Sequence, residues 1–323
     1  MVRKKTIVWM MVAITVLFAA GCTPSSENSS EGQAATSSYG NQEAEQQADA
    51  SFPKTITHLS GETVIAKKPM KIATPYIAFV DYLAVLNVYP VAGQGIDTIH
   101  HNFPNLSKLL QGKEITDLGM EVSMEKLLAA NPDLIIAAND MADKYEQLKQ
   151  IAPTVILPQA GNWRETLIQI ADMIGKEEKA ESVLTAFDMK SAAYKQKLAA
   201  HEHETVLFAM YSGKDQFVTW EWERFEPFYK GLGLKPVPNT EKGGPLTLEG
   251  LAALNPDHIF VINNWQNPVE GGVSKTLKDN EVWRSMEAVK KDQVYYLEDP
   301  SLPGPMALAK INGIEDIIQA MGH

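Results

Sequence analysis

Two segments of this chain repeat one another, which restricts the fold to one built from two equivalent lobes. The first segment, SMEKLLAANPDLII, begins at Ser123, and the second, TLEGLAALNPDHIF, begins at Thr247. In each copy a hydroxyl residue can cap a short helix, and a glutamate two positions later meets the positive end of the helix dipole. Asn-Pro-Asp then ends the helix before an apolar run of strand length. The repeat predicts the same helix-to-strand unit twice.

Apolar runs of strand length alternate with helical patterns in both halves of the chain, which is the signature of parallel βα units. Predicted strands start near residues 71, 91, 134, 154, 205, 217, 258 and 294, and predicted helices start near 79, 124, 143, 162, 224, 248, 276 and 306. A single long helix is predicted from Lys176 to about Ala200, where neither Pro nor Gly occurs. Its apolar face comprises Ala180, Val183, Leu184, Phe187, Tyr194 and Leu198. The predicted fold class is therefore α/β, with two Rossmann-like lobes joined by one long helix and a ligand cleft between the lobes.

The N-terminus carries an export signal. Arg3, Lys4 and Lys5 precede an uncharged apolar run that closes on Ala19, Ala20, Gly21 and Cys22. A membrane span is the alternative, but a span needs about 20 apolar residues. Cleavage before Cys22 would leave that cysteine for lipidation. The polar stretch after it cannot bury enough surface to fold, so it is expected to be a tether.

These features divide the chain into five parts. The boundaries are 1–21 for the signal peptide, 22–52 for the lipidated cysteine and tether, 53–175 for the N-terminal lobe, 176–202 for the bridging helix and 203–323 for the C-terminal lobe.

Composition excludes several classes of function. Cys22 is the only cysteine, so the folded part must hold together without disulfides. A net charge of −11 argues against nucleic acid or an anionic lipid surface as a partner. The sequence contains no G-x-S-x-G, H-E-x-x-H or Walker motif. We therefore expect a binding protein and not an enzyme.

Aromatic residues concentrate in the second half and suggest a ligand-binding wall. Trp220, Trp222 and Arg224 would share one face if the strand near 217 continued through them. Tryptophan offers stacking area and arginine offers planar donors for oxygen atoms. The alternative is that one of the two tryptophans belongs to the core. Further candidate ligand contacts are Tyr211, Trp265, Tyr76 and His101.

Histidines occur in two short clusters. His100 and His101 are expected in a loop at the carboxyl end of a strand, either contacting a ligand or simply solvated. His201 and His203 lie in HEHE at the end of the long helix, where they could bind a surface metal or merely be a solvated helix end.

From about residue 53 to the C-terminus the chain resembles the iron-siderophore class of ABC-transporter solute-binding lipoproteins. The resemblance rests on EVSMEKLLAANPDLII, YEQLKQIAPTVIL, MIGKEEKAE and NPDHIFV, which are typical of that class. It implies two α/β lobes joined by one long helix. It also implies that Glu125 and Glu249, the helix-start glutamates of the repeat, contact arginines of the permease.

The segment Trp222-Glu223-Arg224, followed by Tyr229 and GLGL at 231–234, is similar to the W-G-R, Y and G-L-K pattern of hydroxamate-siderophore binders. In those proteins the tryptophan packs on the ligand and the arginine donates hydrogen bonds to hydroxamate oxygens. Glu223 stands where glycine is usual.

The resemblance implies a ferric siderophore of the hydroxamate type as ligand. Its iron(III) would be held by the siderophore, with no direct metal ligand from the protein and no intrinsic cofactor. The implied partners are an ABC permease and its ATPase, with a lipid anchor on the extracytoplasmic face of a Gram-positive type of membrane and a monomeric protein. Alternatives are a haem or cobalamin-type ligand whose metal is held by His100, His101 or a methionine, a surface-anchored metal-dependent enzyme, and a sensor or adhesion module.

Overall fold

The computed structural model describes residues 51–322. The predicted signal peptide, Cys22 and all but the end of the predicted tether lie outside the described residues. Within residues 51–322, no helix has the length and apolar character needed to cross a bilayer.

The N-terminal lobe is a doubly wound parallel sheet. Its five strands lie in the order β5-β4-β3-β6-β7, and every neighbouring pair is parallel. The strands are β3 (Ile72–Thr74), β4 (Ala92–Gly93), β5 (Thr116–Asp117), β6 (Leu134–Ala138) and β7 (Thr154–Leu157). The helical segments are α1 (Ile77–Val85), α2 (Ile96–Asn102), α3 (Pro104–Leu110), α4 (Met124–Ala129), η1 (Asn139–Lys144), α5 (Tyr145–Leu148) and α6 (Trp163–Ile174). An antiparallel hairpin of β1 (Lys54–His58) and β2 (Gly61–Ile65) precedes the sheet.

The C-terminal lobe has a six-stranded mixed sheet in the order β11-β9-β8-β12-β13, with β10 also pairing with β8. Its strands are β8 (Thr205–Gly213), β9 (Gln216–Trp220), β10 (Lys235–Pro236), β11 (Gly243–Thr247), β12 (His258–Asn263) and β13 (Val294–Leu297). Its helical segments are η3 (Trp222–Phe225), η4 (Pro227–Gly231), α8 (Leu248–Leu254), α9 (Val273–Leu277), α10 (Glu281–Ser285), α11 (Glu287–Lys290) and α12 (Ala307–Met321). The helical pattern predicted near 276 is thus split into three short helices.

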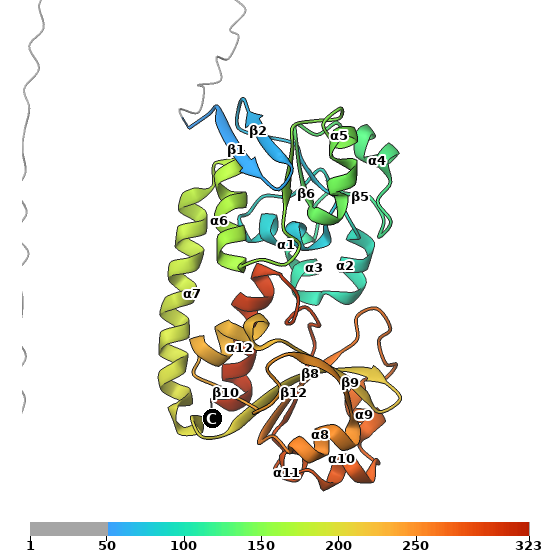
Figure 1. Ribbon diagram of the computed structural model, residues 1–323, viewed down its shortest axis with the longest axis vertical. Coiled ribbons are helices and arrows are strands. Elements are labelled where there is room, and N and C mark those ends of the chain that lie inside the picture. Colours follow the sequence, from blue (N-terminus) through green and yellow to red (C-terminus); the bar gives the residue numbers. More distant parts are fainter. Residues whose placement is uncertain (1–50, 323) are drawn as a thin grey trace, which may run out of the picture. The chain divides into compact units, whose positions relative to one another are not determined.

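One long helix, α7 (Glu177–Lys197), connects the two sheets and continues as a 3-10 turn, η2 (Leu198–His201). Figure 1 shows α7 running along one side of both lobes. Ala180, Phe187 and Leu198 are buried, and Val183, Leu184 and Tyr194 pack against the same core. The predicted apolar face of the long helix is therefore confirmed.

The two copies of the repeat fold alike. Ser123 accepts a hydrogen bond from the Lys126 amide at 3.3 Å, and Thr247 accepts one from the Gly250 amide at 3.0 Å, so both N-caps are confirmed. Asn131 and Asn255 adopt the left-handed conformation that often terminates a helix, with φ of 47° and 41°.

The aspartate of each Asn-Pro-Asp holds the first strand of the main sheet in its own lobe. Asp133 accepts hydrogen bonds from the Met70 and Lys71 amides, just before β3. Asp257 accepts from the amide and hydroxyl of Thr205, the first residue of β8. The repeat therefore specifies a helix start, a helix end and a strand anchor in each lobe.

Helix α12 packs on elements of both lobes. It contacts α1 and α6 of the N-terminal lobe, the connecting helix α7, and η4 of the C-terminal lobe. Ile314 and Ile317 are completely buried in a core cluster that also includes Phe79 of α1 and Phe208 of β8. The last helix of the chain thus belongs to the packing of both halves.

Candidate functional site

Tyr76 lies at the topological switch point of the N-terminal sheet. The first strand of that sheet, β3, has β4 on one side and β6 on the other, and ligands of such sheets bind where the winding reverses, outside the carboxyl ends of the strands. Tyr76 follows β3 and donates its hydroxyl hydrogen to the Gln159 carbonyl at 3.1 Å. Asn139, which follows β6, accepts a hydrogen bond from the Gln159 amide at 2.7 Å. These polar groups are held at the carboxyl edge.

Arg224 is the corresponding cationic group of the C-terminal lobe. It lies in the 3-10 turn η3, and its Nε contacts Glu221 Oε2 at 3.1 Å. One terminal nitrogen of the guanidinium donates to the Pro303 carbonyl at 3.4 Å. The side chain is 41% exposed, so most of its donor positions remain accessible to a ligand.

The charge of Arg224 in the C-terminal lobe acts on Tyr76 in the N-terminal lobe. Burial, followed by the Asp140 carboxylate, raises the pKa of the Tyr76 hydroxyl to about 12, and the Arg224 guanidinium acts in the opposite direction. Charge effects of this kind fall off with distance. The Arg224 guanidinium is therefore near enough to the Tyr76 hydroxyl to lower its pKa slightly.

Trp265 occupies a contact between the lobes. Its backbone carbonyl accepts a hydrogen bond from Asn102 Nδ2 at 3.0 Å, and its ring centroid lies 5.5 Å from that of Phe103. Nearby, Asp299 Oδ2 accepts from the Asn105 amide at 3.0 Å. Trp265 and Asp299 follow the carboxyl ends of β12 and β13, so the carboxyl edges of the two sheets face one another.

The prediction that Trp220, Trp222 and Arg224 share one face of a continuing strand is wrong. Strand β9 ends at Trp220, because its partner β11 begins at Gly243, directly opposite. The chain then enters the 3-10 turn. Trp222 turns its indole nitrogen towards Thr240, 3.0 Å away, and its ring lies edge-on to Tyr229, while Trp220 packs against Phe225. A shared strand face does not exist.

Tyr211 and His101 make contacts that do not include Arg224. Tyr211 is 3% exposed, packs on Phe217 and belongs to the core cluster that includes Leu248 and Leu251 of α8. His101 lies exposed on α2, where its Nδ1 is 2.6 Å from the Asp97 carbonyl oxygen.

His100 also lies on α2, and its Nδ1 is 3.1 Å from Ser107 Oγ. The histidine pair is therefore helical, and the expected loop is wrong. Proline at 104 begins the next helix instead of marking an irregular segment.

The two glutamates of the repeat lie at the same edges as these groups. Glu125 is in the first turn of α4, whose cap Ser123 is hydrogen-bonded to Leu118 at the end of β5. Glu249 is in the first turn of α8, whose first residue is hydrogen-bonded to Asp215 in the β8–β9 turn. Both side chains are exposed. Across residues 51–322, neither carboxylate lies within 4.0 Å of a basic side chain.

Comparison with known proteins agrees with this architecture. A family model described as "Periplasmic binding protein" matches residues 86–300, which is more than half of the chain. The chain belongs to the periplasmic binding protein family. It is a binding protein of a transport system and not an enzyme.

Two curated relatives come from Bacillus subtilis (strain 168). The putative ABC transporter substrate-binding lipoprotein YhfQ is 27% identical over 312 residues, covering 91% of each chain. The iron(3+)-hydroxamate-binding protein YxeB is 27% identical over 310 residues, covering 91% of this chain and 89% of YxeB.

A solved structure shows the same fold. The triscatecholate siderophore binding protein FeuA from Bacillus subtilis, complexed with ferri-bacillibactin, superimposes with a TM-score of 0.69 at 24% identity. The match covers 83% of this chain and 98% of FeuA. The two-lobe fold with its long connecting helix is therefore confirmed.

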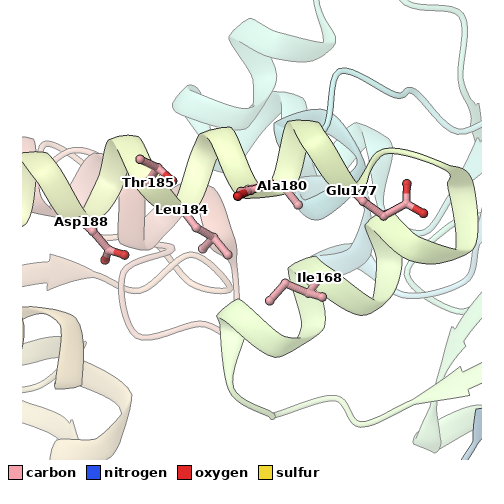
Figure 2. A pocket seen from close by; sticks show the side chains of 7 residues that line it. Ile168, Glu177, Ala180, Leu184, Thr185 and Asp188 are labelled. Carbon is pink, nitrogen blue, oxygen red and sulfur yellow. The ribbon is translucent and has the colours of Figure 1, made fainter.

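Two cavities in this periplasmic binding protein lie along α7, apart from Arg224 and Tyr76. The one shown in Figure 2 has a volume of about 300 Å³ and runs between α6 and α7. It is lined by Ile168, Glu177, Ala180, Glu181, Leu184, Thr185 and Asp188. The other, of about 270 Å³, is an apolar groove where α7 meets α1 and α12. Neither lining contains one of the predicted ligand contacts.

Sequence reasoning missed two buried charged residues that support the site. Asp81 in α1 is 1% exposed, and its Oδ1 accepts a hydrogen bond from the Leu308 amide, in the first turn of α12, at 3.0 Å. Met306, the N-cap residue of α12, makes no side-chain cap. The N-terminus of α12 is therefore capped by a carboxylate of the other lobe. A lone aspartate in the apolar helix IAFVDYLAV was the signal for it.

Lys310, at the end of the first turn of α12, links the backbone of Arg224 to the loop before α12. Its Nζ donates to the Arg224 carbonyl at 3.0 Å and to the Leu302 carbonyl at 2.6 Å. Burial, followed by repulsion from the Arg224 guanidinium, lowers the pKa of Lys310 to about 7, against the attraction of Asp81. A neutral amine still has two hydrogens for these two carbonyls, so the geometry tolerates loss of the charge.

We expect the lowered pKa of Lys310 to be measurable as a pH-dependent stability. Between about pH 7 and 10.5 the unfolded lysine keeps its proton while the folded one has lost it, so the free energy of unfolding rises with pH. Relative to Lys310→Met, the wild type should gain up to about 1.4 kcal/mol per pH unit in that range. Urea unfolding at pH 7 and 9.5 measures this difference.

The exposed Lys278 provides the control for this experiment. Lys278→Met should follow the wild-type pH dependence. If Lys310→Met also runs parallel to the wild type, Lys310 is not neutralised by folding.

Proposed function

We propose that this protein captures a ferric siderophore between the carboxyl edges of its two lobes and delivers it to an ABC permease and its ATPase. The observation that carries the proposal is the pair of contacts between the lobes, Asn102 with Trp265 and Asn105 with Asp299, which brings the carboxyl edges of the two sheets to face one another. Open α/β sheets bind ligands at that edge. Tyr76 and Arg224 are the ligand contacts we propose there. The resemblance in sequence to iron-siderophore binding proteins supports the same ligand class. In this proposal iron(III) arrives within the siderophore, as cargo.

The charges around Arg224 favour a neutral complex of the hydroxamate type. Arg224 is already paired with Glu221, and the Asp140 carboxylate acts on Tyr76. A ferric triscatecholate is trianionic and would bring its charge towards these carboxylates, whereas a ferric trihydroxamate is neutral. Arg224 can donate hydrogen bonds to hydroxamate oxygens through its planar donors. The relatives include both hydroxamate and catecholate binders, so the preference rests on this chain's own charges.

The ligand class is tested by titrating the protein with a ferric trihydroxamate and a ferric triscatecholate while following tryptophan fluorescence. We expect the trihydroxamate to bind more tightly. Arg224→Gln should weaken its binding by roughly 10-fold to 150-fold, which corresponds to about 1.5–3 kcal/mol for hydrogen bonds to a charged group.

The matched control is Arg284→Gln, which replaces an exposed arginine on α10 of the same lobe. It should bind as the wild type does. Tighter binding of the triscatecholate would overturn the hydroxamate preference alone. If neither ferric complex binds more tightly than about 1 μM, the proposed function itself fails.

The exposed glutamates of the repeat are proposed as the docking points for the permease. A carboxylate at a helix N-terminus is favourable on its own, which accounts for one such residue. Both glutamates are exposed at equivalent positions of the two lobes, and neither forms an ion pair among residues 51–322. This recurrence supports an external partner with two basic groups.

Reversing the charge at both positions tests this docking role. Glu125→Lys combined with Glu249→Lys should abolish iron uptake by cells and leave the affinity for the ferric complex unchanged, because neither residue contacts Arg224 or Tyr76. Glu146 and Glu287 are also exposed first-turn glutamates, one in each lobe. Reversing these two should leave uptake intact. Normal uptake by the Glu125 and Glu249 variant would refute the docking role.

We further propose that Cys22 carries a lipid anchor that holds the protein on the extracytoplasmic face of the membrane. Two or more acyl chains give a stable anchor where one does not. A tethered receptor stays close to its permease, and tethering raises the effective concentration of one partner near the other. In this proposal the five-part division holds, with 53–175, 176–202 and 203–323 as lobe, bridge and lobe.

A further inference from the structure

A cluster of His201, Glu204 and His258 lies where the end of the connecting segment meets the C-terminal sheet. His201 ends the turn η2 after the long helix, Glu204 precedes β8, and His258 is the first residue of β12. The cluster therefore sits at the amino ends of two parallel strands. It joins the end of the connecting segment to the sheet of the C-terminal lobe.

The three side chains direct potential metal-binding atoms to one point. Glu204 Oε2 lies 2.5 Å from His201 Nδ1 and 2.7 Å from His258 Nε2, and the ligand atoms all lie within 4.8 Å of one another. A tetrahedral zinc ion has ligands at about 2.0–2.2 Å, which separates them from each other by about 3.4 Å. To accept the ion, the two carboxylate–nitrogen distances would have to widen by less than about 1 Å, and ligand atoms that are farther apart would have to approach by at most about 1.4 Å.

A second layer of contacts holds the ligands in place. His258 is 1% exposed, and its other ring nitrogen, Nδ1, is 3.2 Å from the hydroxyl of Tyr295 on β13. If Nδ1 carries the hydrogen and donates it to that hydroxyl, the lone pair of Nε2 is free for a metal, which is the usual arrangement of a metal-binding histidine. The Glu204 amide is hydrogen-bonded to the His201 carbonyl, which fixes the short turn between these two ligands.

We propose that His201, Glu204 and His258 bind a divalent transition-metal ion of the zinc class, with water as the fourth ligand. Two imidazoles and a carboxylate suit zinc, and they leave one coordination position open. The bound ion would link the end of the connecting segment to the starts of β8 and β12. Cys22 is the one cysteine of the chain, so no disulfide within the chain can supply such a link. The site is separate from the ligand-binding edge and does not depend on the proposed function.

His203 offers a matched control within the same short sequence. It is a neighbour of Glu204, but its side chain is 89% exposed and it is outside the cluster. The full-length protein, purified without a histidine tag and treated with a chelator, is titrated with ZnCl₂ by calorimetry. It is also titrated with CoCl₂, because the visible absorption of cobalt reports four-coordination.

We expect one ion per protein, a rise in Tm, and the intense cobalt spectrum of a four-coordinate site. His201→Gln and Glu204→Gln should each weaken zinc binding by about 100-fold or more, because loss of a direct ligand exceeds the effect of losing an outer partner. His203→Gln should bind as the wild type does. All four proteins should give the same circular dichroism spectrum without metal, which shows that each variant is folded.

Two results would overturn the proposal. The first is zinc binding weaker than about 100 μM by the wild type, which would leave a hydrogen-bonded cluster and nothing more. The second is equal loss of binding in His203→Gln and His201→Gln, which would assign the ion to the exposed histidine.

Discussion

The packing of the two lobes against one another depends on the first turn of α12. The helix has no side-chain cap of its own, and its amide at Leu308 is satisfied by Asp81, which belongs to α1 of the other lobe. An unpaired amide at a buried helix end is costly. Separating the lobes would therefore leave the Leu308 amide without its hydrogen-bond acceptor. A hydrogen bond to the ionised Asp81 carboxylate contributes about 1.5–3 kcal/mol.

The same turn also positions the ligand-binding edge. Lys310 lies three residues after Ala307 and binds the carbonyls of Arg224 and Leu302. Arg224 in turn donates to Pro303, so the 3-10 turn and the loop before α12 are held as one unit. Both Asp81 and Lys310 are fully buried, and burial raises the pKa of Asp81 to about 7. Burying a polar or charged group is costly unless it is hydrogen-bonded. Here the hydrogen-bond partners of Asp81 and Lys310 are backbone groups of α12, of Arg224 and of the loop before α12.

Much of the architecture was accessible from sequence because it is encoded locally. Ser123, Thr247 and the two Asn-Pro-Asp motifs each act on neighbouring backbone, so the two lobes could be inferred from residue types and spacing. The apolar face of α7 followed from helical periodicity in the same way.

The site was harder to predict, because side-chain direction depends on where pairing stops. The expected wall of Trp220, Trp222 and Arg224 assumed that β9 continued. Its partner strand begins at Gly243, opposite Trp220 and 23 residues away in sequence (243 − 220 = 23), so the pairing stops there. Asp81 and Lys310 were missed for a related reason. Their partners lie on Leu308 and Arg224, which sequence spacing does not connect to them.

Because Asp81 of one lobe caps α12, which packs on both lobes, we expect the two lobes to bind a ferric complex with little relative movement. Because Cys22 is the only native cysteine, a Cys22→Ser protein can carry spin labels at two introduced cysteines, replacing the exposed Leu128 on α4 and Lys278 after α9. Electron–electron resonance then measures the distance between the lobes with and without the ferric trihydroxamate. We expect one narrow distribution of the distance between the two labels, with a mean that shifts by less than about 2 Å on binding. A broad distribution that contracts well beyond that on adding the ligand would contradict it.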